Sequence, residues 1–117
     1  MVTNSAKSGE IKCPVTGILQ IIGGKWKPVI LYCIRSDKRR FGEISARIPG
    51  LSRKVLTQQL KELEKDGLLT RKQYNEIPPR VEYELTALGK SLSPVLKEME
   101  KWGTKNIMNK AKGSRKA

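Results

Sequence analysis

The 117-residue sequence contains no histidine and only two cysteines, Cys13 and Cys33. The missing imidazole removes Ser–His and Cys–His catalysis, the most frequent general base and every histidine-containing zinc site. Two cysteines twenty residues apart cannot form a zinc cage, and they are too few for the disulfide framework of a small secreted domain. Since no other nucleophile can be paired with a base, we expect no catalytic residues, no metal and no cofactor.

Long apolar runs are missing as well. The longest, residues 29–34, has six residues, whereas a membrane-spanning helix needs about 20. No signal-peptide pattern stands at the N-terminus. The length favours one domain, and 38% apolar with 5% aromatic residues suits a small helical one. We therefore expect a cytoplasmic protein that does not contact a membrane.

Acidic residues are outnumbered, with 11 against 24 basic residues and a net charge of +13. The two ends, residues 1–12 and 105–117, carry seven of the basic residues but only one acidic residue, so residues 13–104 keep a net charge of +7. A basic folded part indicates a polyanionic partner, most simply nucleic acid. Charge by itself would suit RNA, a ribosome or an anionic membrane surface equally well.

Helical apolar spacing, interrupted by glycine and proline, predicts four short helices that are followed by two strands and a long last helix. Thr86 is expected to cap the last helix, which extends to about Asn109 and bends near Pro94. Residues 36–40 are expected to form a charged turn. The other predicted elements are helices over about 14–22, 25–34, 41–48 and 53–66 and strands over 68–74 and 80–85.

This order of elements is that of a winged helix–turn–helix. The expected fold is mainly α with a small β hairpin (α+β), in which the hairpin is the wing and the first and last helices are added to the motif. One domain is expected over residues 13–109, between a flexible N-terminal arm over 1–12 and a basic, disordered tail over 110–117.

The fourth predicted helix has one apolar and one polar face. At 100° per residue, Val55, Leu56, Leu60 and Leu63 fall on one buried arc, and a basic, amide-bearing face lies opposite. Arg and Lys suit guanine edges, Gln suits adenine and a Thr methyl suits thymine, so these residue types fit a major groove. The solvated face of any amphipathic helix would look similar. The Pro-Gly turn before the helix, the basic charge and the hairpin favour DNA.

Basic residues also border the predicted hairpin and precede the third helix. Arg71 and Lys72 enter the hairpin and Arg80 leaves it, where they would lie on phosphates or enter the minor groove; a role in solubility alone stays open. Lys38 and its two arginine neighbours are candidate phosphate clamps with the same alternative. The predicted DNA-binding residues are Arg39, Arg40, Ser52, Arg53, Lys54, Thr57, Gln58, Lys61, Arg71 and Arg80.

The chain resembles the HxlR-type winged helix–turn–helix regulators of bacteria and archaea in three segments, "CPVTGILQIIGGKWKPVIL" (13–31), "RRFGEISARIPGLSRKVLTQQLKELEKDGLLTRK" (39–72) and "PPRVEYELTALGKSL" (78–92). The resemblance implies a homodimer on double-stranded DNA, with the fourth helix of each subunit in a major groove and the wing beside it. Two-fold symmetry then predicts a roughly palindromic operator, with half-sites about 34 Å apart or a multiple of that. We expect a transcriptional repressor on the nucleoid; the alternative is a non-specific, architectural nucleic-acid-binding protein.

In such proteins the first and last helices form the dimer interface, which fits the apolar stripes on both predicted helices. Core packing within one subunit is the alternative for both stripes, because folding alone requires one apolar face per helix. The residues predicted for the interface are Val15, Ile18, Leu19, Ile22, Leu92, Val95, Leu96, Met99 and Trp102.

Cys13 lies at or next to the N-cap of the first helix beside Lys12, and both the helix N-terminus and a nearby cation favour the reactive thiolate. Several members of the resembled family sense quinones, other electrophiles, oxidants or formaldehyde through a cysteine at this position. Its aldehyde sensors carry a lysine two residues later, where this chain has Val15, which argues against formaldehyde. Cys13 is therefore either a sensor thiol for a reactive inducer (quinone, aldehyde or oxidant) or a silent thiol. Cys33 is expected to be buried and inert.

Overall fold

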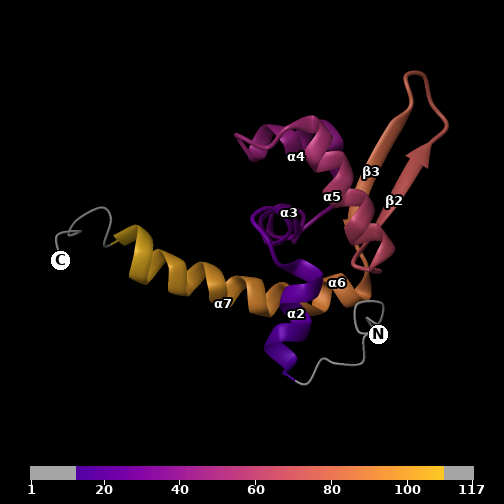
Figure 1. Cartoon of the computed structure of the whole chain (residues 1–117). Coiled ribbons are helices and arrows are strands. Elements are labelled where there is room, and N and C mark those ends of the chain that lie inside the picture. Colours follow the sequence, from indigo (N-terminus) through magenta and orange to yellow (C-terminus); the bar gives the residue numbers. More distant parts are fainter. Residues whose placement is uncertain (1–12, 110–117) are drawn as a thin grey trace.

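The computed structural model describes residues 13–109 and has the predicted order of helices and strands (Figure 1). The predicted arm over 1–12 and tail over 110–117 lie outside the described residues. The elements are α2 (Pro14–Ile22), α3 (Lys27–Cys33), β1 (Arg39–Arg40), α4 (Phe41–Arg47), α5 (Arg53–Lys65), β2 (Leu69–Tyr74), β3 (Arg80–Leu85), α6 (Ala87–Ser91), α7 (Ser93–Gly103) and the π-helical segment η1 (Thr104–Met108).

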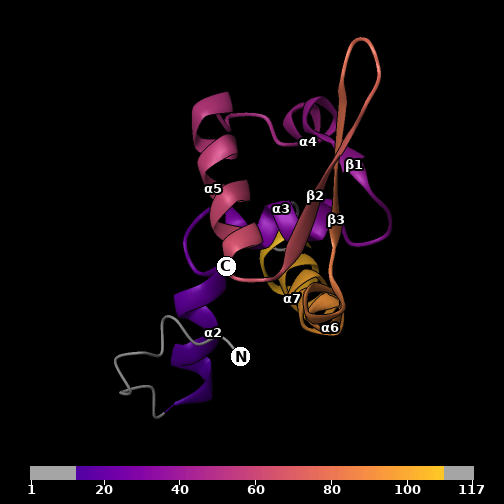
Figure 2. The same ribbon diagram turned by 90° about the vertical axis from the view of Figure 1, so that its right-hand side faces the viewer.

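The fold is mainly α with a small β wing, as expected from the sequence. The hairpin of β2 and β3 projects from one end of the molecule, where α4 and the start of α5 also lie (Figures 1 and 2). The helices α2, α6 and α7 lie at the opposite end, with α3 between the two groups. The two surfaces that the sequence assigned to DNA and to a second subunit are therefore separated along the molecule.

Three short strands form one antiparallel sheet in the order β1–β3–β2. β2 and β3 pair over their full length, from Leu69 opposite Leu85 to Tyr74 opposite Arg80. The two residues of β1 pair with the other edge of β3. The sequence predicted a turn over residues 36–40 and was wrong about β1, because two residues are too few for an alternating pattern.

The apolar stripe of α5 lies in the core. Leu56, Leu60 and Leu63 are at most 1% exposed, and Val55 packs against the core from its edge, so the predicted buried arc is confirmed. Burial of each leucine contributes about 2 kcal/mol, and together they fix the rotation of α5 about its axis. Ser52 begins the helix, as its sequence position suggested, and its Oγ accepts a hydrogen bond of 3.1 Å from the Val55 N–H.

The end of α5 leads directly into the wing. The N–H of Leu68 donates to the Leu63 carbonyl and the N–H of Gly67 donates to the Glu64 carbonyl, both at 3.0 Å. Gly67 has a φ of +79°, which completes the Schellman arrangement that glycine favours at a helix end. Leu68 and Leu69 enter the core at once, being 3% and 1% exposed. The base of β2 is therefore anchored to the last turn of α5.

Thr86 ties the end of the hairpin to this same turn. Its Oγ1 accepts a hydrogen bond of 3.0 Å from the Gly89 N–H, and donates one of 2.7 Å to the Gly67 carbonyl. The Thr86 N–H donates to the Leu68 carbonyl at 3.1 Å. A side chain at position 89 would collide with that carbonyl, so the close approach of α6 requires glycine. Thr86 caps the helix, as predicted.

The long last helix expected from the sequence is divided into α6 and α7. Leu92 is the C-cap of α6 and also the N-cap of α7. Pro94 lies in the first turn of α7. Because proline has no N–H to donate, the helical hydrogen-bond ladder cannot run through it. The predicted bend is therefore a break, two residues before the proline. Among residues 13–109 there is no helix of the length and apolarity needed to cross a membrane.

Replacing Thr86 by alanine should lower the free energy of unfolding by about 1–2 kcal/mol, because the helix cap and the bond to the Gly67 carbonyl are both lost. Thr86→Ser keeps the hydroxyl and should stay within about 0.5 kcal/mol of the original protein. Urea unfolding at one protein concentration, followed by circular dichroism, measures both variants. An equal loss in the two variants would mean that the methyl group, and not the hydroxyl, stabilises the junction.

Candidate nucleic-acid interface

The polar face of α5 is exposed. The start of this helix lies at the end of the molecule that carries the wing (Figure 2). It follows α4 after a short turn, which is the helix–turn–helix arrangement. Its residues are held in part by neighbours: the Arg53 guanidinium lies 4.7 Å from the centre of the Phe41 ring, and the Thr57 Oγ1 donates to the Arg53 carbonyl at 2.8 Å. The exposed residues of this face are Arg53, Lys54, Thr57, Gln58 and Lys61.

Of the two acidic residues beside this face, the exposed Glu64 lies on the side of Thr57 and Lys61, whereas Glu62 is neutralised from another helix. The Lys27 Nζ on α3 lies 2.7 Å from the Glu62 Oε1, and this hydrogen bond lowers the pKa of Glu62. The other carboxylate oxygen of Glu62 is 3.4 Å from the Gln58 Nε2. Lys54 and Lys61, in contrast, pair with no carboxylate among residues 13–109. The uncompensated charge of the α5 face is therefore positive.

An open pocket of about 380 Å³ separates α5 from the wing sheet. Lys61 comes to it from α5 and Arg71 from β2, so the fold brings together two cations that are distant in the sequence. A carboxylate, Glu64, also borders the pocket. Two cations beside a hydroxyl suit a phosphate group better than a base edge. The complete lining is Phe41, Thr57, Lys61, Glu64, Arg71 and Tyr83.

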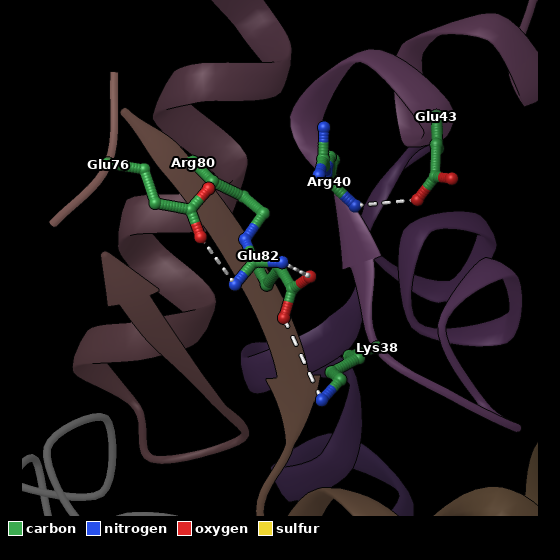
Figure 3. A network of polar contacts seen from close by, with 6 residues as sticks. All are labelled: Lys38, Arg40, Glu43, Glu76, Arg80 and Glu82. Atoms are coloured by element: carbon green, nitrogen blue, oxygen red, sulfur yellow. Dashed lines mark hydrogen bonds and ion pairs between the residues drawn. The ribbon is translucent and has the colours of Figure 1, made fainter. Parts of the chain in front are cut away.

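The other face of the wing sheet carries a network of charged residues (Figure 3). The Arg80 guanidinium lies 3.0 Å from Glu76 and 3.8 Å from Glu82, and stacks 3.7 Å from the centre of the Tyr74 ring. The Lys38 Nζ approaches Glu82 from the segment before β1, at 3.8 Å. The side chain of Arg80 is only 27% exposed. Arg80 therefore stabilises the wing through these contacts, and its predicted DNA contact stays a prediction.

Two further predicted clamps differ from each other in the structure. The Arg39 Nε donates to the Cys33 carbonyl at 3.2 Å, which closes the end of α3. This bond uses the Arg39 Nε, and the predicted DNA contact of Arg39 stays a prediction. Arg40 is exposed, and only its backbone N–H is engaged, at 2.9 Å from the Glu43 Oε1 (Figure 3). The guanidinium of Arg40 stays a candidate for DNA.

Apolar side chains at the opposite end of the molecule divide into two groups. Ile22 and Leu96 are 3% exposed and belong to the core, which fits the alternative of packing within one subunit for these two. Ile18 and Leu92 are partly buried against the core. The remaining predicted residues are well exposed, with values from 40% for Val95 to 63% for Trp102; they are Val15, Leu19, Val95, Met99 and Trp102.

A shallow apolar groove of about 260 Å³ lies between α3 and α7 and continues this exposed surface. Val29 and Met99 line it from the two helices and are themselves 43% and 51% exposed. Exposed apolar patches of this kind usually mark contacts with another protein.

The two cysteines lie in different surroundings. Cys13 is exposed at the N-cap of α2, where the backbone N–H groups of Thr16 and Val15 lower the pKa of its thiol. Hydrogen bonding by these two groups and by the Thr16 side chain favours the thiolate, and this is the cause of the lowered pKa. Burial raises the pKa of Cys33, which is partly buried against the core. Lys12, which the sequence analysis placed beside Cys13, lies outside the described residues.

Comparisons with known proteins match this geometry. A family model described as HxlR-like helix-turn-helix matches residues 21–111. The uncharacterized HTH-type transcriptional regulator YdeP of Bacillus subtilis is 45% identical over 107 residues, which cover 90% of this chain and 84% of YdeP. The chain belongs to the HxlR-like helix-turn-helix family. It is therefore a transcriptional regulator of the helix–turn–helix type.

Two of the solved structures that are similar to this HxlR-like chain have names that refer to redox regulation or to treatment with diamide. The redox regulator HypR in its oxidized form has a TM-score of 0.77 and 44% identity, and the match covers 80% of this chain and 97% of HypR. The diamide-treated YodB of B. subtilis has a TM-score of 0.67 and 33% identity, covering 83% and 97%.

Sequence reasoning missed the residues that organise the wing of this HxlR-like protein. Tyr74, Glu76 and Glu82 form the network around Arg80, and none was singled out. Strand alternation was a usable signal, because neighbours in a strand face opposite sides of the sheet. It separates Arg71, which borders the pocket, from Lys72, which lies 5.2 Å from the Tyr74 ring on the other face.

Alanine substitutions should distinguish base contacts from phosphate contacts. Lys54→Ala and Gln58→Ala should each weaken specific DNA binding by about 1–3 kcal/mol and relax the preference at one base pair. Lys61→Ala and Arg71→Ala should weaken binding to all sequences alike, and each should reduce the slope of log affinity against log salt by about one. Titrations of specific and random duplexes at several salt concentrations measure both effects. A loss of sequence preference in Lys61→Ala would contradict its assignment to phosphate.

Proposed function

We propose that this protein is a sequence-specific transcriptional repressor that binds a palindromic operator as a homodimer. The observation that carries the proposal is the exposed face of α5, with uncompensated Lys54 and Lys61, beside the pocket that Arg71 borders. A major groove accepts such a helix, and the phosphates at its edge would meet the pocket. The DNA-facing set that we propose first is Arg40, Ser52, Arg53, Lys54, Thr57, Gln58, Lys61 and Arg71. Arg39 and Arg80, whose guanidinium groups have protein partners, are secondary candidates.

The homodimer is supported by the apolar side chains left exposed on α2 and α7. Val15 is 62% and Trp102 is 63% exposed, which is costly in water and favourable in an interface. These helices lie at the end opposite the wing (Figure 1), so two copies joined there would keep both α5 helices accessible. A two-fold axis would then present two equal half-sites to the DNA.

Repression is the simplest outcome of such binding, because occupancy of an operator is enough to exclude polymerase. The protein would then act in the cytoplasm, on the nucleoid. The high net charge of +13 also favours a second candidate, a non-specific architectural nucleic-acid-binding protein. Both candidates bind DNA with a steep salt dependence, so only sequence preference separates them.

A repressor should prefer a palindrome upstream of its own or a neighbouring gene by about 10³-fold or more over random DNA. Competition titrations at fixed salt with labelled palindrome and unlabelled random duplex measure this ratio. Duplexes with one half-site replaced provide the control, and they should bind much more weakly if two subunits make equal contacts. Equal affinity for palindrome and random DNA would support the architectural protein instead.

We further propose that Cys13 responds to electrophiles or oxidants. Its exposure and its lowered pKa favour the thiolate, and relatives include proteins named redox regulator HypR and diamide-treated YodB. The thiolate would add to a ring carbon of a quinone, forming one carbon–sulfur bond while the electron pair of the ring double bond moves to the carbonyl oxygen. Water supplies one proton, and tautomerisation gives the hydroquinone thioether without a further oxidant or reductant. Because Cys13 begins α2, which carries part of the proposed dimer surface, a bulky adduct there would change the spacing of the two α5 helices.

Cys13→Ser should keep operator affinity but abolish the release of DNA by quinone or hypochlorite. The matched control is Cys33→Ser, which should leave the release intact, since burial keeps that thiol protonated. Alkylation of Cys13 should also be faster than that of Cys33 at neutral pH, and its rate should rise with pH through a midpoint below the usual thiol value. Mass spectrometry after iodoacetamide pulses measures these rates. Unchanged release in Cys13→Ser would remove this cysteine from the response.

A further inference from the structure

The tip of the wing carries a large apolar side chain that the rest of residues 13–109 leaves uncovered. Ile77 is 98% exposed, far more than the other exposed large hydrophobic residues, which lie between 40% and 63%. It stands between Tyr74, where β2 ends, and Arg80, where β3 begins. Two prolines follow it directly, so the backbone after Ile77 is stiff and has no N–H groups to offer. Ile77 is therefore the exposed large apolar residue whose side chain is most available for a contact.

The base of this tip is rigid. The Tyr74 ring and the Arg80 guanidinium stack at 3.7 Å across the last pair of the hairpin, and Glu76 and Glu82 hold the other side of the guanidinium. Figure 3 shows that the Arg80 side chain lies between these two carboxylates. Ile77 is therefore presented from a fixed support, which reduces the conformational entropy lost when it binds.

Charge at the tip is also balanced. Glu76 is the acidic residue of the tip, and it pairs with Arg80 at 3.0 Å. This pair reduces the repulsion between Glu76 and DNA. It also engages the guanidinium of Arg80, which the sequence assigned to a phosphate. The tip, residues 75–79, contains no lysine or arginine. Contact by the tip would therefore rest on Ile77 and the prolines, and not on attraction to phosphate.

The hairpin has the length needed to reach a second groove. Six residues of β2 span about 20 Å. One turn of DNA is about 34 Å, so a major groove and the next minor groove lie about half of that apart along one side. With α5 in the major groove, the projecting hairpin seen in Figure 2 would bring its tip to the neighbouring minor groove.

We propose that Ile77 is a minor-groove contact, which packs as an apolar wedge against sugars and base edges and adds preference for deformable sequence beneath the wing. Side chains such as isoleucine serve this purpose in other minor-groove proteins, and the preference arises from the cost of widening or unstacking the DNA. The proposal rests on the proposed DNA-binding function. It assigns part of the sequence preference to a residue outside α5. In the wing, the sequence predicted only basic contacts.

Ile77→Ala should weaken binding to the specific palindrome about five- to tenfold, because apolar contact area is lost. Its salt dependence should equal that of the original protein, because no charge changes. Asn75→Ala, at the same tip, is the matched control and should bind within twofold of the original protein. Ile77→Met keeps the apolar bulk and should bind nearly as tightly. Since Ile77 contacts solvent, thermal unfolding should be unchanged in all three variants.

The DNA can be altered as well. Replacing G·C by inosine·C pairs beneath the wing removes the guanine amino group from the minor groove and leaves the major groove unchanged. This change should strengthen binding of the original protein several-fold and have little effect on Ile77→Ala. Equal affinity of Ile77→Ala and the original protein, or an equal response of both to inosine, would overturn the proposal. If the original protein itself prefers no palindrome, the proposed function fails instead, and the two failures are distinguishable.

Discussion

Burial of the leucine stripe of α5 is the interaction on which the rest of the structure depends. Leu56, Leu60 and Leu63 fix the rotation of this helix, and the polar face can then point only toward solvent. The Schellman turn at Gly67 carries the same constraint into β2, because Leu68 enters the core directly after the helix ends. Thr86 closes the unit by bonding the end of the hairpin to this turn. Recognition helix and wing therefore form one rigid body.

The fold distributes charge in a way that the net value of +13 does not describe. Lys27 neutralises Glu62 beside the α5 face, and Arg80 neutralises Glu76 at the wing tip. Both pairs remove acidic groups from surfaces that would face a polyanion, and both use up cations. The remaining electrostatic attraction comes from fewer side chains, which stand on α5 and beside the pocket. In the proposed complex, the contact of the tip would then rest on Ile77.

Local patterns predicted most of the secondary structure. The buried arc of α5, the Ser52 and Thr86 caps and the two strands of the hairpin were all confirmed, because each depends on residues within one or two turns of the chain. The two-residue strand β1 and the break at Leu92 were not predicted as such. A two-residue strand exists only through its partner strand. The position of a break depends on how the two helical pieces pack, and not on the proline alone.

The same division applies to the candidate site. The sequence by itself determined that α5 has a basic face, that the apolar stripes of the first and last helices exist and that Cys13 begins a helix, since helical periodicity and capping are local properties. Only the tertiary structure decided which members of these sets are available. Arg39 and Arg80 have protein partners, Ile22 and Leu96 lie in the core, and Ile77 is exposed. Burial and pairing depend on residues that are distant in the chain, and no single-sequence pattern contains that information.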